Sequence, residues 1–254
     1  GLVTFCRNQA LPSLSMLVAF PYIVVVVGMG YTRQSVALGF FMLGLVALEN
    51  GNFWRYIRMT IFATLFHASA ILLLPLALIV VKRYIFIKLL AAAIFVAVAV
   101  SFLLAAQVDY VRATYFQPEL FIISSPGTMI RYVMVLFPAL LLLLTIKKLE
   151  IKRMSTSIYT IRLWKVIAFS SFFMIIPMIF LGSSNTVVDR ILLYWLPLQL
   201  FVFGNIPVTY LSNKYIYVII YFMIITYSFM VFYIWFSFSN NSFSYVPYSN
   251  YLWL

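Results

Sequence analysis

Long apolar runs recur from one end of the chain to the other, and they constrain the fold more than any other feature. Runs of about 20 residues have the length that crosses a ~30 Å hydrocarbon core as a helix. Hydrophobic residues make up 65% of the 254 and charged residues only 9%, whereas a soluble domain is about half apolar and a quarter charged. Membrane-spanning strands alternate apolar and polar residues, and these runs do not. The sequence therefore predicts an all-α, polytopic transmembrane helical bundle.

About eight membrane segments are expected, separated by short polar or basic stretches. In chain order they are Leu11–Gly28, Gln34–Leu48, Met59–Val81, Leu89–Ala106, Met129–Ile146, Val166–Leu181, Ile191–Phe203 and Tyr215–Phe238. The second is short enough to be re-entrant instead of crossing the bilayer. The chain opens at Gly1 in mid-pattern, without a cleavable signal peptide. We therefore expect residues 1–254 to be a single integral membrane domain that lacks N-terminal spans.

The sides of the membrane can be predicted from the positive charge. Lys147–Lys165 carries the densest positive charge in the chain, and cytoplasmic loops have an excess of Lys and Arg. Counting segments from this stretch puts Gln107–Thr128, Ser183–Arg190, Arg55 and Arg58 outside, and Lys82–Lys88 and Arg33 inside. If Gln34–Leu48 is re-entrant, Arg33 moves to the outer face.

The formal net charge is +12, from 17 Lys and Arg against 5 Asp and Glu. Two explanations stay open: the positive-inside bias with attraction to anionic headgroups, and a site for an anionic substrate. No recognisable nucleic-acid-binding motif is present. With so few acidic residues a metal cage of carboxylates is not expected, and no cofactor is predicted. The lone Cys6 cannot form an intrachain disulfide and is expected to be a small apolar filler.

Two short strings put ionisable groups inside apolar segments. GYTRQSVALGF (Gly30–Phe40) contains Arg33, and FATLFHASAILLLP (Phe62–Pro75) contains His67, the only histidine. An ionisable side chain at the bilayer centre costs roughly 3 kcal/mol on insertion scales, so both residues need an explanation. The guanidinium group grips phosphate oxygens through two parallel hydrogen bonds. Arginines near the ends of spans therefore suit the binding of a diphosphate without a metal.

Four strings in the order GYTRQSVA, FHASA, DRILLYWLP and terminal VPY resemble the EpsG-type membrane proteins. These are the Wzy-like polymerases of bacterial exopolysaccharide and O-antigen synthesis, and the resemblance runs from about Tyr22 to the end. It implies a GT-C-like fold in the bacterial inner membrane. The implied activity is that of a metal-independent glycosyltransferase joining oligosaccharide units carried on undecaprenyl diphosphate, at the outer face. The implied partners are this lipid-linked glycan, a flippase and a chain-length regulator.

The resemblance also implies roles for individual residues. Arg33 and Arg190 would hold the diphosphate, Gln34 would hydrogen-bond the sugar or Arg33, and His67 would take the proton of the acceptor hydroxyl. Tyr194 lies one turn past Arg190 and would share its helix face. Further candidates are Asp189, Arg112 and Tyr248. Val188 and Asp189 stand where the family pattern has a small or polar residue before the arginine, which leaves the role of Asp189 open.

Each of these residues also has a structural explanation. Arg33 would be a snorkelling arginine at the interface, and Arg190 would form a salt bridge with acidic residues of adjacent loops. Gln34 and His67 would be polar contacts between helices, and Tyr248 would be an interfacial anchor.

Two other functions compete with the polymerase. A flippase of lipid-linked sugar would have a similar basic cavity, and an O-antigen ligase or acyltransferase would share the membrane chemistry. A flippase needs a continuous polar path through the bundle, whereas the polar residues here gather at the ends of spans. This pattern favours the enzyme.

Overall fold

The computed structural model describes residues 1–79, 85–105, 127–152, 158–181, 186–239 and 242. Over these ranges all regular structure is helical and no strand occurs, so the predicted all-α class is confirmed. The helices are α1 (Leu2–Arg7), α2 (Pro12–Ala19), η1 (Phe20–Val27), α3 (Gly28–Gly30), α4 (Thr32–Glu49), α5 (Phe53–Phe66), η2 (Ala68–Leu73), α6 (Leu76–Ile79), α7 (Ile85–Ala105), α9 (Thr128–Lys152), α10 (Ile158–Phe173), α11 (Ile175–Leu181), α12 (Thr186–Leu192), η3 (Leu193–Trp195), α13 (Pro197–Thr209) and α14 (Lys214–Phe238).

Within the described ranges, five helical stretches are long and apolar enough to cross a membrane. They are Pro12–Gly30, Thr128–Leu149, Tyr159–Ile179, Val188–Thr209 and Lys214–Phe238. The chain is therefore a multi-pass membrane protein. Two further apolar helices, Ala68–Leu78 and Leu90–Ala99, are shorter. The total of about eight segments and the GT-C-like class stay predictions.

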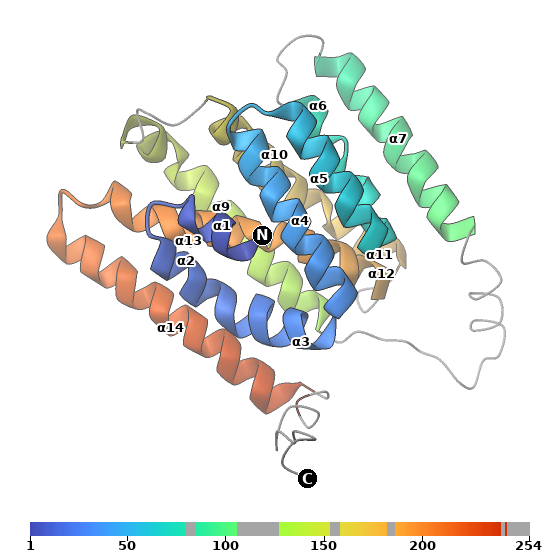
Figure 1. Ribbon diagram of the computed structural model, residues 1–254. Helices are drawn as coiled ribbons and strands as arrows, with labels where there is room; N and C mark the ends of the chain where they lie inside the picture. Colours follow the sequence, from blue (N-terminus) through green and yellow to red (C-terminus); the bar gives the residue numbers. More distant parts are fainter. Residues whose placement is uncertain (80–84, 106–126, 153–157, 182–185, 240–241, 243–254) are drawn as a thin grey trace.

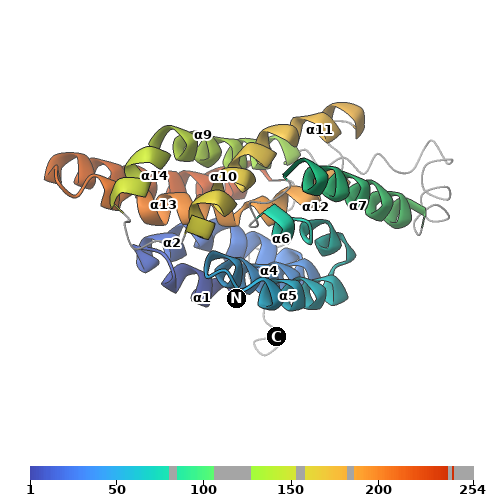
Figure 2. The ribbon, with the colours of Figure 1, turned by 90° about the horizontal axis from the view of Figure 1, so that it is seen from above.

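Helix α13 forms the centre of the bundle. In the apolar part of the stretch Val188–Thr209, 83% of the residues are buried, whereas in that of Lys214–Phe238 only 11% are buried. In Figure 2, α4 and α5 lie on one side of α13, and α9 and α11 lie on the other. Helices α7 and α14 lie at opposite edges of the molecule (Figure 1). Hydrogen bonds to neighbouring segments help to fix the position of such a central, mostly apolar helix.

Hydrogen bonds of this kind join α13 to the N-terminal segment. The hydroxyl of Ser15 donates to the carbonyl oxygen of Leu200 at 3.1 Å, and the side-chain amide of Asn205 donates to Gln9 at 2.8 Å. A Cβ added to Gly204 would lie 1.9 Å from the Ser15 hydroxyl oxygen. Small residues and interhelical hydrogen bonds are the usual means of close helix packing in membranes, and α2 and α13 use both.

Helices α4 and α5 form a tight antiparallel hairpin. Its turn begins after Glu49 and contains Gly51 at φ 73°, a conformation that favours glycine. The Asn52 side chain caps α5 by accepting from the backbone of Arg55 at 3.0 Å. A Cβ added to Gly44 would lie 3.2 Å from the Tyr56 ring, so a small residue permits the close approach.

The prediction that Met59–Val81 forms one continuous span is wrong. Helix α5 ends at Phe66, and His67 has an extended backbone (φ −148°, ψ 110°). The chain then folds back, because the Tyr56 hydroxyl near the start of α5 donates to the Leu73 carbonyl oxygen at 2.6 Å. Ser69 competes with helical pairing by bonding the His67 side chain. Pro75 lacks the backbone N–H that a continuous helix would need.

With the chain reversed at His67, two ends of the bundle can be named by the residues that lie there. The arginine end contains Tyr31, Gln34, His67, Arg131 and Arg190, which lie in contact or within electrostatic range of one another. The basic end contains the α4–α5 turn and the region of the Lys148 side chain, whose nitrogen lies 3.5 Å from the Tyr210 hydroxyl.

The α4–α5 turn belongs to the basic end because Glu49 is bonded to the first turns of α10. Its carboxylate accepts from Trp164 and its carbonyl accepts from Thr160. The prediction that Arg55 and Arg58 lie opposite the Lys147–Lys165 stretch is therefore wrong. The predicted side is wrong because Met59–Val81 folds back at His67 instead of crossing the bilayer once.

The same reversal puts Arg33 at the end of the bundle that holds Arg190. Gln34, its neighbour in α4, donates to the backbone of Arg190. This agrees with the outer-face alternative for Arg33, although the cause is the fold-back at His67. Residues 34–48 lie within one continuous helix, α4.

Candidate functional site

Arg190 is the half-buried cation at the arginine end. Its guanidinium carbon lies 3.8 Å from the centroid of the Tyr31 ring, so the two groups are in cation–π contact. The side-chain amide of Gln34 donates to the Arg190 carbonyl oxygen at 2.6 Å. In the described residues no carboxylate forms an ion pair with Arg190, because neighbouring Asp189 pairs elsewhere. The structure thus brings together two predicted site residues, Arg190 and Gln34, and adds Tyr31.

Arg131 is a second arginine at this end, and it is firmly anchored. It forms an ion pair with Asp189, and its Nε donates to the Tyr22 hydroxyl. The side chains of Arg131 and Asp189 are only 8% and 2% exposed. Thr128 also donates to the Asp189 carboxylate, at 3.4 Å. The sequence places Arg131 at the start of a span but gives no sign that it meets Asp189.

The local helix geometry positions Tyr22 for this contact. Tyr22 lies in η1, a π-helical segment that continues α2 and contains Pro21 near its start. π-Helical turns interrupt the usual pairing and often occur at functional sites. The arginine of one segment thus meets the tyrosine of another across the bundle, which no local sequence pattern predicts.

Among the described residues, Arg131 and Arg190 carry more positive charge than Asp189 neutralises. Arg131 and Arg190 lie close enough to interact electrostatically, and both also interact with Tyr22. Asp189 provides one negative charge, which it shares with Arg131. Uncompensated charge is costly at membrane depth. A net positive site of this kind can be stabilised by a bound anion.

His67 lies beside this charge, at the break between α5 and η2. Its Nδ1 lies 2.7 Å from the Ser69 hydroxyl oxygen, and its ring centroid lies 6.5 Å from that of Tyr194. Arg190 is close enough to act on His67 electrostatically. The structure therefore gathers three predicted residues, His67, Tyr194 and Arg190, at one end. Ser69 is an additional member.

Two buried polar atoms at this end have no hydrogen-bond partner in the described part of the chain. They are Gln34 Oε1 and the Tyr194 hydroxyl, although that hydroxyl lies near Ser69 without suitable hydrogen-bond geometry. A buried polar atom left unpaired costs about 1–3 kcal/mol. Atoms of this kind can bond the hydroxyl groups of a ligand.

The helix containing Arg190 and Tyr194 is not uniform. Helix α12 ends at Leu192 and continues as the 3₁₀-helix η3, so the spacing from Arg190 to Tyr194 is not that of a regular α-helix. A 3₁₀-helix has three residues per turn instead of 3.6. Tyr194 turns into the core, where its ring lies edge-on to Phe41 with centroids 5.8 Å apart.

The remaining predicted residues are Arg33, Arg112 and Tyr248. Arg33, in the first turn of α4, is exposed and has no hydrogen bond or ion pair within the described residues. Arg112 and Tyr248 lie outside the described residues. Their roles stay predictions.

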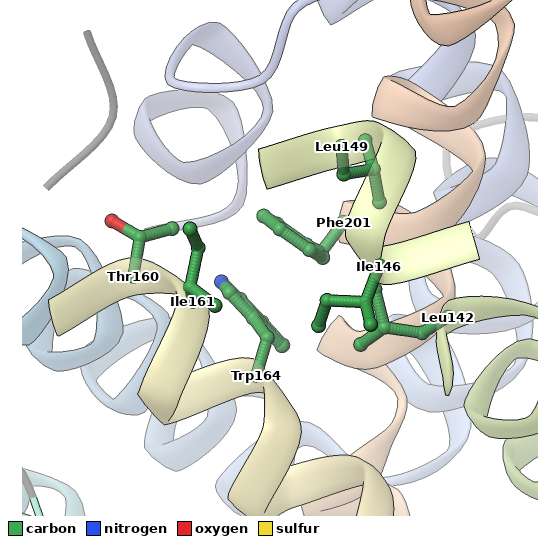
Figure 3. A pocket seen from close by; sticks show the side chains of 7 residues that line it. All are labelled: Leu142, Ile146, Leu149, Thr160, Ile161, Trp164 and Phe201. Atoms are coloured by element: carbon green, nitrogen blue, oxygen red, sulfur yellow. The ribbon is translucent and has the colours of Figure 1, made fainter. Parts of the chain in front are cut away.

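A small cavity of about 20 Å³ lies between α9, α10 and α13, toward the basic end. Figure 3 shows its lining side chains, which are Leu142, Ile146, Leu149, Thr160, Ile161, Trp164 and Phe201. The Trp164 and Phe201 rings stack with centroids 4.3 Å apart. The lining is almost entirely apolar, and a space of this size holds about one water molecule. It carries no charged group for substrate recognition.

Comparison with protein families matches residues 2–250 to the model of the EpsG family. No curated protein and no solved structure matches the chain.

Proposed function

The chain belongs to the EpsG family, and from this premise we propose that it is a membrane polysaccharide polymerase. It acts as a glycosyltransferase that joins oligosaccharide repeat units carried on undecaprenyl diphosphate into exopolysaccharide, capsule or O-antigen. The observation that carries the proposal is the state of Arg190. This guanidinium is half-buried, in contact with Tyr31, and has no ion-pair partner in the described residues.

Arg190 binds the diphosphate of the donor. Its guanidinium is always charged and donates two parallel hydrogen bonds to phosphate oxygens. At an effective dielectric constant of about 20, a charge pair ~4 Å apart is worth about 4 kcal/mol, against ~1 kcal/mol in water. Arg33, which lies at the same end, provides a second charge at the exposed rim.

His67 acts as the general base. The acceptor hydroxyl oxygen bonds to the anomeric carbon of the donor, and the bond from that carbon to the diphosphate oxygen breaks. The electron pair leaves with the lipid diphosphate, and the acceptor proton passes to His67 Nε2. Donation from Nδ1–H to the Ser69 hydroxyl, 2.7 Å away, keeps Nε2 free to accept. General-base catalysis of this kind contributes typically 10²–10⁴-fold.

Gln34 and Tyr194 bind sugar hydroxyl groups. Both present a buried polar atom that lacks a partner in the described structure. A site that hydrogen-bonds a ligand hydroxyl discriminates against a ligand that lacks it. These two residues therefore contribute to recognition of the repeat unit.

Transport of the lipid-linked unit across the bilayer is the competing function. A flippase needs a polar path between the two ends, and α4 is instead lined inside the bundle by Leu38, Phe41, Met42 and Leu45, all buried. This apolar lining supports the polymerase.

The test is the length of surface glycan in cells that lack the protein. The proposal predicts that single repeat units still reach the surface while polymer disappears. Polymer returns with the wild-type gene. Loss of all exported units would instead identify a flippase, and unchanged polymer would remove the proposal.

A further inference from the structure

Asp189 forms its ion pair with Arg131, which is less accessible than Arg190. Asp189 is adjacent to Arg190 in the sequence, yet its carboxylate pairs with Arg131 from α9. Thr128, one turn before Arg131, bonds the same carboxylate. The Tyr22 hydroxyl accepts from Arg131 Nε. Three segments thus hold the Arg131–Asp189 pair in place, and Arg190 is left without a carboxylate among the described residues.

We infer that Asp189 is a positioning residue that sets the affinity of the arginine end for a diphosphate anion, by neutralising Arg131 and leaving Arg190 to bind. The inference rests on the proposed function, since it concerns the diphosphate that the proposed reaction binds and releases. Without the Asp189 carboxylate, the two positive charges would bind the anion more tightly and release it more slowly. With Asp189 paired to Arg190 instead, the anion would scarcely bind.

The charges of Arg131 and Arg190 lie close enough to act on each other. Arg131 and Arg190 interact electrostatically with each other, and each also interacts with Tyr22. Arg131 and Asp189 are almost fully buried, so solvent screens them poorly. At an effective dielectric constant of about 20, one charge a few ångströms away changes an anion affinity by at least about tenfold.

Three variants test the inference through charge balance. Asp189→Asn removes the negative charge and keeps the shape, and Arg131→Gln removes the positive charge. The double variant Asp189→Asn, Arg131→Gln restores the wild-type charge with two neutral groups that can still hydrogen-bond each other. Breaking a buried ion pair by changing one partner destabilises a protein. The double variant therefore provides a folded comparison if a single variant does not fold.

The measurement is calorimetric titration of inorganic diphosphate into the purified full chain in nanodiscs of zwitterionic lipid. We expect Asp189→Asn to bind at least about tenfold more tightly than wild type, and Arg131→Gln at least about tenfold more weakly. The double variant should bind within about threefold of wild type. Arg55→Gln, on an exposed residue of the basic end, and Glu150→Gln, ~28 Å along α9 from Arg131, repeat the two charge changes at a distance. Both should leave the affinity unchanged.

Several results would overturn the inference. These are weaker or unchanged binding by folded Asp189→Asn, a double variant that stays about tenfold from wild type, or no binding of diphosphate by any folded protein. A merely structural Asp189 cannot tighten anion binding when it is replaced. Because the titration contains no glycan, it separates the two proposals. The expected order of affinities without polymerisation would remove only the proposed function, and polymerisation without that order would remove only this inference.

Discussion

At the scale of single residues, the arginine end holds two guanidinium groups in different ways. Arg131 is fixed by an ion pair with Asp189 and a hydrogen bond to Tyr22. Arg190 is in contact with the Tyr31 ring, and its other described contact, from Gln34, is to its backbone. Of these two arginines, Arg190 is therefore the one whose guanidinium can take up an anion without first losing a carboxylate partner among the described residues.

Tyr31 should be needed for its ring and not for its hydroxyl. A partly desolvated cation–π contact is worth about 1–2 kcal/mol, and loss of it lets the Arg190 side chain move. We expect Tyr31→Leu to lower polymer formation by about tenfold and Tyr31→Phe to retain at least half of it. The yield of polymer at matched expression measures both. Equal activity of the leucine and phenylalanine variants would show that the contact has no functional role.

Variants at His67 and Ser69 distinguish a catalytic role of His67 from a structural one. Glutamine retains hydrogen bonding but cannot take a proton, so His67→Gln should lose about 10²-fold or more in rate. Ser69→Ala removes the group that orients the ring and should cause a smaller loss. Both are measured as initial rates of the purified protein. If His67→Gln polymerises at the wild-type rate, His67 is not the base.

The strings that carry the resemblance lead to five members of this site, which are Gln34, His67, Asp189, Arg190 and Tyr194. Tyr22 and Arg131 could not be found in this way. Their contact joins two segments far apart in the chain, and neither lies in a string that carries the resemblance. Arg131 could have been suspected as a buried charge near a span end, but its partner could not.

At the scale of elements, the break at His67 has the largest consequence. Hydropathy averages composition over a window, so Met59–Val81 reads as one uninterrupted apolar segment. The local signals against this are the His67–Ser69 contact and Pro75, which act through backbone geometry and not through hydrophobicity. The sequence therefore predicts the helical class correctly, while the path of this segment depends on its packing against α5.

Two glycines should respond oppositely to the same substitution. Gly204→Ala would put a Cβ into the Ser15 side chain, whereas a Cβ at Gly39 meets nothing within 4 Å. Overpacking costs typically 1–3 kcal/mol, and alanine in a helix is up to about 1 kcal/mol better than glycine. We expect a lower midpoint of thermal unfolding in detergent for Gly204→Ala, and an equal or higher one for Gly39→Ala. A tolerated Gly204→Ala would contradict the close contact of α2 and α13.

At the scale of the whole molecule, the helices separate an arginine end from a basic end. Positive charge in Lys147–Lys165 predicts which end is cytoplasmic. The fold-back at His67 then puts Trp54 with the basic end and Ser35 with the arginine end. These relations could not be predicted from the sequence. When the sides are counted backwards from Lys147–Lys165, an error in one crossing changes the predicted side of every segment that precedes it in the chain.

Cysteine labelling tests this arrangement. Ser35→Cys should react with a membrane-impermeant thiol reagent in intact cells, and Trp54→Cys, at a side chain 72% exposed, only after permeabilisation. Native Cys6 gives little background, because burial raises the pKa of its thiol from 9.0 to about 11 and keeps it protonated at neutral pH. Labelling of both cysteines from the same side would contradict the two-ended arrangement.

The central claim is that the arginine end binds the lipid diphosphate of a polymerising substrate through Arg190. Its most direct test is polymerisation by the purified protein in liposomes supplied with a lipid-diphosphate-linked oligosaccharide. Glycan length is resolved by gel electrophoresis. Wild type should produce a ladder of repeat units, and so should Arg55→Lys as the control. Arg190→Lys should lose at least about tenfold in rate, because lysine keeps the charge but lacks the planar fork. A normal ladder from Arg190→Lys and Arg190→Gln would contradict the claim.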